Sequence, residues 1–223
     1  MSADHSAKSS ACCFCRDLNR QDEPLLLQRE GFVNKICRDS EHFAVFPSLS
    51  PLCEGHSLVV PKYHVTNTHD SPRTHHIELV TFLQSVADDL AAALGNVVLF
   101  EHGVPPGHPG GCGVQHAHIH LLPAAPAVTR SIERRLRKEL NVKVMPDFGS
   151  FLDEESVASP YLVFGGIRAR VNVASTADVP SQFMRRLVAE AAGFEHWDWR
   201  EYFGWKAFEA TRALLLNEAV AGV

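Results

Sequence analysis

Three histidines alternate with single apolar residues near the middle of the chain, at His116, His118 and His120. Side chains of a β-strand point alternately to its two faces, so this spacing places the three imidazoles on one face and apolar side chains on the other. Burying three ionisable rings without partners is costly, which disfavours a run of ordinary core histidines. We therefore predict a strand over residues 114–122 that packs one face on a helix and turns its imidazoles toward a cleft, for metal binding or catalysis.

The flanking sequence predicts a mixture of strands and helices. Apolar residues recur every three or four positions over residues 72–94, which is typical of a helix with one buried face, and Gly95 would end it. Short runs rich in β-branched and aromatic residues predict strands at residues 32–37, 42–47, 57–61 and 97–101. After a Pro/Ala linker, we expect a charged helix at 131–140, strands at 161–164 and 169–174, and helices at 180–192 and 205–219.

This pattern predicts three parts. Residues 1–11 are small and polar, and we expect a disordered leader. Residues 12–125 contain the histidine strand and the long helix, and they form the expected catalytic domain. Residues 126–223 form an α+β extension that we expect to pack on this core.

Composition excludes some partners. The chain has 21 basic and 26 acidic residues, and its formal net charge of −5 gives no general positive field for nucleic acid. No apolar run near the start approaches the length of a signal sequence or a membrane span. We therefore expect a cytoplasmic protein with no nucleic-acid and no membrane partner, whose six cysteines are free thiols or metal ligands.

A glycine-rich stretch precedes the histidines and indicates anion binding. The backbone amides of Gly111, Cys112 and Gly113 lack bulky neighbours and could approach phosphate oxygens closely. Alternate histidines on a strand could also hold zinc, so two types of chemistry are open. A potential nucleophile beside an anion cradle favours phosphoryl or nucleotidyl transfer.

The sequence resembles the histidine triad family at three places. The first is the run His116-Ala117-His118-Ile119-His120-Leu121-Leu122, the second spans residues 54–64 (EGHSLVVPKYH), and the third is Phe100-Glu101-His102-Gly103. The likeness covers about residues 12–125, and the chain is most similar to extended bacterial members with a Cys-x-x-Cys and a C-terminal extension. It implies an α+β fold, with an antiparallel sheet supported by helices, a nucleotide in a cleft beside the triad, and a homodimer as a frequent assembly.

The resemblance also implies roles for the histidines. His118 would be the nucleophile that takes up a nucleoside monophosphoryl group, and His120 would contact the phosphate. His56 would hold the ring of His118 so that its reactive nitrogen is unprotonated. His116 is either the third catalytic member or a zinc ligand. The implied activity is hydrolysis or nucleotidyl transfer on a nucleoside phosphoanhydride or phosphoramidate.

One departure affects the substrate site. Many hydrolases of this family have Gly-Gly-Gln-Ser-Val before the triad, whereas residues 111–115 read Gly-Cys-Gly-Val-Gln. We take Gly111, Cys112, Gly113 and Gln115 as candidate substrate-binding residues. Relatives of galactose-1-phosphate uridylyltransferase often carry Gln at the third triad position, so His120 favours hydrolysis. A dinucleoside polyphosphate phosphorylase, a non-catalytic nucleotide-binding module and a metallohydrolase are the alternatives.

Cys12 and Cys15 have the spacing of two ligands on one zinc ion. The spacing alone also fits two free thiols. The resemblance adds His64 and His116 as the remaining ligands of a structural zinc, and Cys13 is an alternative first ligand.

The extension offers two further candidates. Gln182 and Arg185 are three residues apart at the start of a predicted helix, where free backbone amides favour anions. They could contact a nucleotide phosphate or a second subunit, and a solvated basic face is the alternative. The aromatic residues at 194–205 are expected to pack together rather than to stack on a base.

Overall fold

The computed structural model describes residues 12–19, 36–108, 113–176 and 179–217. The predicted leader at 1–11, most of the predicted strand at 32–37 and the substrate-site candidates Gly111 and Cys112 lie outside these ranges. Among the helices of the described part, none is long and apolar enough to cross a lipid bilayer.

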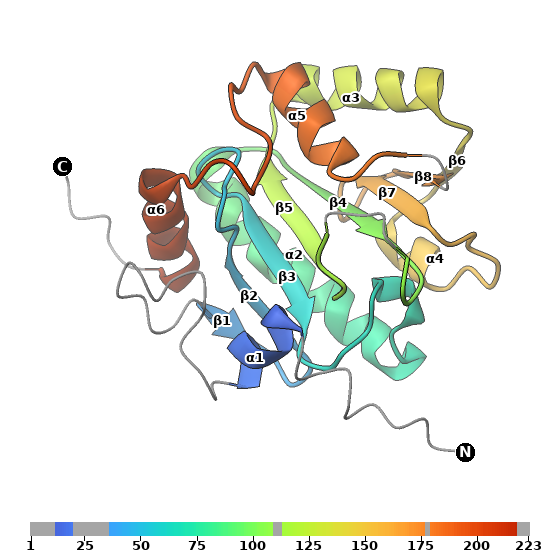
Figure 1. The fold of residues 1–223 in the computed structure, drawn as a ribbon, viewed down its shortest axis with the longest axis horizontal. Helices are drawn as coiled ribbons and strands as arrows, with labels where there is room; N and C mark the ends of the chain where they lie inside the picture. The colour runs from blue at the N-terminus through green and yellow to red at the C-terminus, as the bar shows by residue number, and fades with distance from the viewer. Residues whose placement is uncertain (1–11, 20–35, 109–112, 177–178, 218–223) are drawn as a thin grey trace.

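One antiparallel sheet of eight strands runs through the molecule (Figure 1). Its spatial order is β1-β2-β3-β5-β4-β7-β8-β6. The strands are β1 (Arg38–Asp39), β2 (Phe43–Pro47), β3 (Ser57–Pro61), β4 (Val97–Gly103), β5 (Ile119–Pro123), β6 (Val142–Met145), β7 (Tyr161–Gly165) and β8 (Val171–Ser175). With its helices, this sheet makes an α+β fold, as the sequence predicted.

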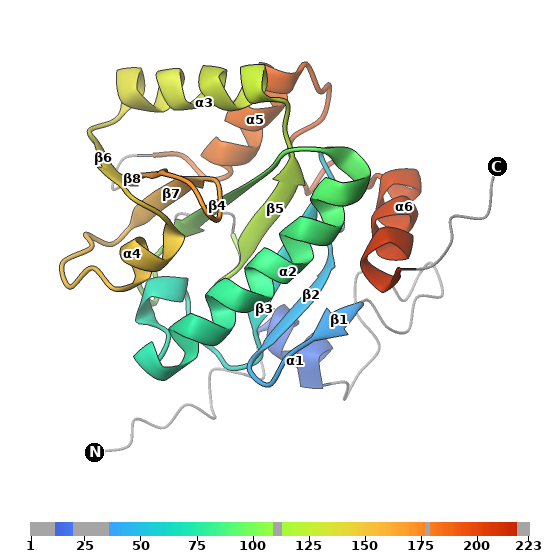
Figure 2. The ribbon, with the colours of Figure 1, turned by 180° about the vertical axis from the view of Figure 1, so that it is seen from behind.

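Helices cover both faces of the sheet. Three of them pack on one face: α2 (His76–Leu94), α4 (Phe148–Leu152) and α6 (Trp205–Leu216). Figure 2 shows this face, with α2, the longest helix, in front of the strands and roughly along them. The other face carries α1 (Cys13–Asn19), α3 (Pro126–Glu139) and α5 (Phe183–Ala192). Helix α1 packs on β2 and β3, whereas α3 and α5 pack on β4, β5 and β7. Two short 3-10 helices, η1 (Thr68–Asp70) and η2 (Arg73–His75), precede α2.

The extension continues the sheet of the core. Strand β7 pairs with β4 over five residues, from Leu99 opposite Gly165 to Gly103 opposite Tyr161. A Cβ atom at Gly103 would overlap the ring of Tyr161, so the close approach of this ring requires glycine. The Tyr161 hydroxyl donates to buried Glu101 over 2.7 Å, and the amide of Thr68 donates to the same carboxyl over 2.8 Å. The extension and the core therefore share one sheet and one buried hydrogen-bond network.

Several helices and strands begin at residues other than those predicted from the sequence. Helix α3 begins at Pro126 rather than at residue 131, because proline at the first helical position supplies the right φ and needs no amide partner. The helix predicted over 72–94 begins with the 3-10 turn η2 and becomes α-helical only at His76. Strand β5 begins at Ile119, so His116 and His118 precede the regular strand. Strand β6 and helix α4 were not predicted.

Candidate active site

The histidine segment keeps its two faces although only its second half is regular strand. Ile119 and Leu121 are fully buried on the side of α2. His118 and His120 line a cavity on the opposite face. The amide of Ala117 donates to the carbonyl of Val65 over 2.7 Å, which holds the start of the segment against the loop after β3. The alternation expected of a strand therefore holds for His118 and His120, whereas His116 lies in a cluster with Cys12, Cys15 and His64 and not in the cavity wall.

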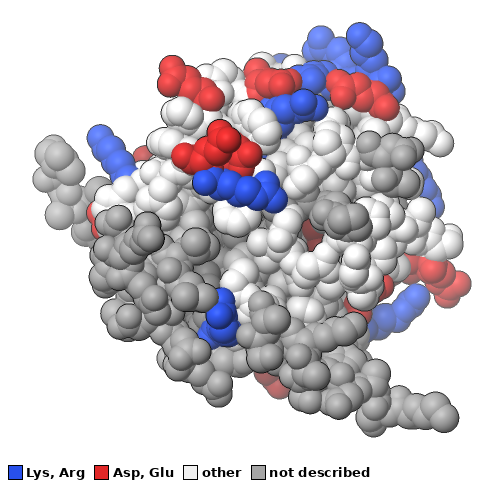
Figure 3. All heavy atoms as spheres, in the orientation of Figure 1, with Lys and Arg blue, Asp and Glu red and all other residues white. Residues whose placement is uncertain are grey.

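The cavity lies between α1 and the pair α3 and α5 on this face of the sheet, and its volume is about 70 Å³. Helix α1, strands β2, β3 and β5, helix α5 and the loop after α5 all contribute to its wall, which is mostly apolar. The lining residues are Cys13, Phe14, Phe46, Ser48, Leu49, Ser50, Leu58, Val114, His118, His120, Arg185 and Trp199. In Figure 3 the charged side chains gather at the upper edge of this face, and its centre is largely uncharged. An apolar cavity with a few imidazole and guanidinium groups is typical of a small-molecule site.

The tautomer of His118 follows from one contact. Its Nδ1 lies 2.6 Å from the backbone carbonyl oxygen of His116. A carbonyl oxygen can only accept, so Nδ1 carries the proton in the neutral ring. Nε2 is then unprotonated and has the lone pair that a nucleophile needs.

A second chain of contacts fixes His120. The amide of Leu52 donates to Nδ1 of His56 over 2.9 Å, so the proton of neutral His56 is on Nε2. This nitrogen lies 2.8 Å from Nδ1 of His120, and the His120 proton is therefore on its own Nε2. The His120 ring also stacks on Phe100, with centroids 4.2 Å apart. His120 is thus oriented as a hydrogen-bond donor.

Both of these histidines are kept neutral by their surroundings. Burial, and secondarily the charge of Arg185, holds the pKa of His56 well below its ordinary value. Burial, followed by His56 and His118, lowers the pKa of His120 in the same way. The chain of donors from Leu52 to His120 is consistent with two neutral rings.

The expected direct contact between His56 and His118 was wrong. His56 bonds to His120, and the backbone carbonyl of His116 holds the Nδ1 proton of His118. The physical reason is register: Leu58 on β3 lies opposite His120 on β5, so the residue just before β3 reaches the third histidine of the triad.

The described residues of the glycine-rich loop border a neighbouring hollow. Gly113 and Gln115 line it together with Cys12 and His64. Oε1 of Gln115 accepts from the amide of Gly107 over 3.2 Å, so this side chain bridges the loop. Gly111 and Cys112 lie outside the described residues.

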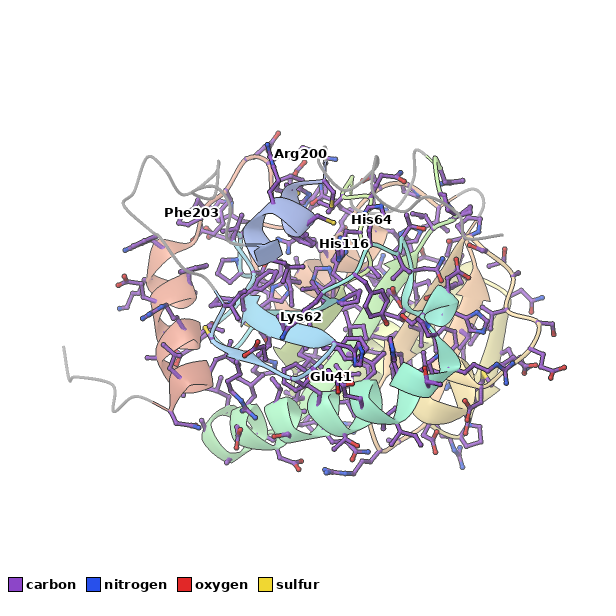
Figure 4. All side chains as sticks on the ribbon, turned by 90° about the horizontal axis from the view of Figure 1, so that it is seen from below. Glu41, Lys62, His64, His116, Arg200 and Phe203 are labelled. Atoms are coloured by element: carbon purple, nitrogen blue, oxygen red, sulfur yellow. The ribbon has the colours of Figure 1, made fainter. Side chains whose placement is uncertain are left out.

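Cys12, Cys15, His64 and His116 form a cluster that could hold a metal ion, with ligand atoms all within 4.8 Å of one another. Nδ1 of His116 lies 3.4 Å from Sγ of Cys12 and 3.5 Å from Sγ of Cys15, and Nδ1 of His64 lies 3.3 Å from Sγ of Cys15. Zinc bonds of about 2.3 Å to sulfur and about 2.0 Å to nitrogen, at a tetrahedral angle, separate S and N by roughly 3.5 Å. In Figure 4, His64 and His116 lie together beside α1, which is on the opposite side of the strands from α2.

The protonation of this cluster also fits a metal. Nε2 of His116 donates to the carbonyl of Pro61 over 2.9 Å, which leaves its Nδ1 lone pair toward the thiols. Burial and the adjoining Cys12 raise the pKa of the Cys15 thiol to about 12, and a bound cation would reverse this shift. Cys13, the alternative first ligand, lines the cavity instead.

The two candidates from the extension lie in different places. Arg185 lines the cavity, and its guanidinium donates to the carbonyl of Ser50 over 2.7 Å and to that of Trp197 over 2.8 Å. Gln182 is not part of the cavity wall. Its side chain donates to Asp198 over 2.8 Å and accepts from the amide of Trp199 over 3.1 Å, so it holds the loop after α5.

Two residues near the site were not singled out from the sequence. Trp199 belongs to the aromatic stretch that was expected only to pack, and it lines the cavity. His102 follows Phe100 on the same face of β4, and its Nε2 lies 3.0 Å from the hydroxyl of Thr176. Trp199 carries no sequence signal that separates it from an ordinary packing residue, whereas His102 lies in one of the segments that resemble the histidine triad family, which could have singled it out.

Comparison with known proteins finds similarity in the first part of the chain. Residues 32–127 match the HIT domain model. Adenosine 5'-monophosphoramidase HNT1 of Saccharomyces cerevisiae is 29% identical over 116 residues, which cover 51% of this chain and 63% of that protein. An uncharacterized HIT-like protein of Methanocaldococcus jannaschii is 28% identical over 118 residues, covering 50% of this chain and 78% of that protein. The chain thus spans less than two thirds of the yeast protein.

Among solved structures, a hypothetical histidine triad nucleotide-binding protein from Sulfolobus tokodaii strain 7 is similar, with 24% sequence identity and a TM-score of 0.40. The alignment covers 52% of this chain and 70% of that one. The three alternating histidines lie inside residues 32–127, the range that matches the HIT domain model. Cys12, Cys15 and most of the extension lie outside this range. Residues 32–127 of this chain are thus similar to the HIT domain, the domain of the histidine triad family.

Proposed function

We propose that this protein is a nucleotide hydrolase or nucleotidyltransferase that acts through a covalent nucleotidyl intermediate on His118. The observation that carries the proposal is the tautomer of His118, whose proton is held by a backbone carbonyl while the ring lines an apolar cavity. The HIT domain and the likeness to a phosphoramidase support the same chemistry.

In the first step, Nε2 of His118 attacks the phosphorus of a nucleoside phosphoanhydride or phosphoramidate. A P–N bond forms, the bond to the leaving group breaks, and the leaving group takes the electron pair. Water then attacks the same phosphorus, the P–N bond to His118 breaks, and a nucleoside monophosphate and a proton are released. Nε2–H of His120, oriented through His56, would donate to a phosphoryl oxygen in both steps.

The cavity supplies a place for the nucleoside. Phe14 and Phe46 contribute aromatic walls and Leu58 an aliphatic one, which suits a planar base. Arg185 brings a buried positive charge to the same cavity as His118 and His120. Gly113 and Gln115 remain proposed contacts to the substrate. The same role is proposed for Gly111 and Cys112, which lie outside the described residues. Gln182 is proposed to act indirectly, through the loop after α5 that it holds.

Zinc is the proposed structural metal, held by Cys12, Cys15, His64 and His116. Bound zinc would fix the start of α1, and hence Cys13 and Phe14, against the histidine segment. In this proposal His116 has a structural role, and its carbonyl, rather than its ring, serves His118. A homodimer and a cytoplasmic location stay predictions.

The experiment compares the wild-type protein with His118→Asn on two substrates, a diadenosine polyphosphate and adenosine 5'-phosphoramidate. Asparagine has no nucleophilic lone pair, so we expect the rate to fall by a factor of about 1,000 or more on both. Equal rates would remove the enzymatic proposal. Running the assay with and without inorganic phosphate separates hydrolysis from phosphorolysis, because transfer of the adenylyl group to water gives AMP, whereas its transfer to phosphate gives ADP.

A further inference from the structure

The loop after α5 places Arg200 beside a residue of the cavity wall. Arg200 stacks over the ring of Trp199, with its guanidinium carbon 5.2 Å from the ring centroid, and Trp199 lines the cavity that contains His118. We propose that Arg200 binds the leaving group when that group is a phosphate, and so makes the enzyme selective for phosphoanhydrides over phosphoramidates. This inference rests on the function proposed above.

The contact with Gly113 is the most specific observation. A Cβ atom at Gly113 would overlap Nη2 of Arg200, so the guanidinium occupies the space where other residues have a side chain. Gly113 also has φ +87°, a conformation that favours glycine. Val114, the next residue, lines the cavity with Trp199. Arg200 thus lies between two segments that both form the wall around the reactive histidine.

This position has a chemical consequence. When a phosphoanhydride is cleaved, the P–O bond breaks and its electron pair stays on the leaving phosphate, which gains negative charge. A guanidinium stabilises that charge through two parallel N–H donors. When adenosine 5'-phosphoramidate is cleaved, the nitrogen takes a proton and leaves as neutral ammonia, so the same arginine contributes little.

The local charges leave this guanidinium available to a ligand. Nη1 of Arg200 lies 3.8 Å from Oδ1 of Asp198, longer than a hydrogen bond, and the arginine side chain is 47% exposed. That Asp198 oxygen already accepts from Nε2 of Gln182 over 2.8 Å and from the amide of Arg200 over 2.9 Å. Gln182 therefore holds Asp198 and the loop in place, while the arginine head group extends toward Gly113.

The test compares Arg200→Ala with the wild-type protein on substrates that share the adenylyl group. For diadenosine tetraphosphate we expect kcat/KM to fall by about 10- to 100-fold, the usual range for a lost charged hydrogen bond. For adenosine 5'-phosphoramidate we expect a change within about threefold. On diadenosine tetraphosphate, we expect the kcat/KM of Arg200→Lys to lie between that of the wild type and that of Arg200→Ala, because lysine keeps the charge but loses the paired donors.

Arg186→Ala is the matched control. Arg186 is in the same extension, is 43% exposed and lies 3.9 Å from the carboxylate of Glu190, so it shares the charge and exposure of Arg200 but not its place. We expect its rates on both substrates to equal those of the wild type. Losses of equal size on the two substrates in Arg200→Ala, or no loss on either, would overturn the inference.

A binding measurement keeps the two proposals separate. Inorganic pyrophosphate serves as a probe of the leaving-group site in isothermal titration calorimetry. We expect Arg200→Ala to bind pyrophosphate at least about tenfold more weakly than the wild type and Arg186→Ala. If the wild type turns over neither substrate, the proposed function fails, whereas equal pyrophosphate affinity in Arg200→Ala and wild type refutes the role of Arg200.

Discussion

The core at residues 12–125 and the C-terminal extension contribute to the site in different ways. The core supplies His120 from β5, His118 from the residue just before β5 and His56 from the residue just before β3, and strand register brings His56 to His120. The extension supplies Arg185 from a helix and Trp199 and Arg200 from the loop that follows it. The comparison teaches that the reactive groups are built on the rigid sheet, while the residues proposed to select the substrate come from a loop held by side-chain hydrogen bonds.

The start of the core and the extension are also attached to the central sheet by different kinds of contact. Helix α1, at the start of the core, contacts the histidine segment through the Cys/His cluster. The extension is joined by strand pairing between β4 and β7 and by the buried contacts of Tyr161. We therefore expect metal removal and changes at the β4–β7 junction to destabilise the molecule in separable ways.

The largest effect on stability is expected from the metal cluster. A ligand that binds only the folded state stabilises it by about 4 kcal/mol when its free concentration is a thousandfold above Kd. We expect the purified protein to contain about one zinc per chain, and Cys15→Ser or chelation to lower Tm by several degrees. Less than about half an equivalent of metal would contradict the zinc proposal. Cys13→Ser, which changes a neighbouring thiol outside the cluster, is the control for loss of a cysteine.

The next effect concerns the junction of core and extension. Gly103→Ala would force the ring of fully buried Tyr161 to move, and such overpacking costs about 1–3 kcal/mol. Urea denaturation followed by fluorescence measures the change in the free energy of unfolding. Gly149→Ala in α4 is the control, because its added methyl group would meet no atom nearer than 3.4 Å and its backbone φ is not positive. A Gly103→Ala loss no larger than the control would show that the junction is loosely packed.

The smallest effect is a dependence of stability on pH at the same junction. Burial, with His108 and His118 next, lowers the pKa of His102 from 6.5 to about 4. As the pH falls below 6.5, the unfolded chain binds a proton at this residue that the folded protein excludes, so stability decreases between pH 6.5 and about 4. Between pH 7 and 5.5 we expect wild type to lose about 1 kcal/mol more than His102→Gln. Parallel pH profiles of the two proteins would contradict this assignment.

Much of the fold could be predicted from local patterns. The periodicity of residues 72–94 gave the long helix, and the apolar run at 57–61 gave β3, because each element buries a continuous apolar face. The pattern failed at β6, where Val142 is half-buried and Val144 is exposed at the end of the sheet, so that no regular alternation exists. Pairing of β7 with β4 could not be predicted, since it depends on the fit of Tyr161 over Gly103 rather than on either strand alone.

The candidate site likewise has some features that the sequence predicts and others that depend on tertiary contacts. The shared face of His118 and His120 follows from alternation along the chain, and so it could be predicted. The partner of His56 could not, because it depends on the register between β3 and β5. The positions of Trp199 and Arg200 depend on the hydrogen bonds of Gln182 to a loop sixteen or more residues away, which no local pattern encodes.

The most direct test is intact-protein mass spectrometry at neutral pH, within seconds of mixing the protein with diadenosine tetraphosphate or adenosine 5'-phosphoramidate. The account predicts a transient mass increase of one adenylate less water, located by peptide mapping on His118 and absent from His118→Asn. Turnover at the wild-type rate with no adduct, or an adduct on another residue, would contradict it.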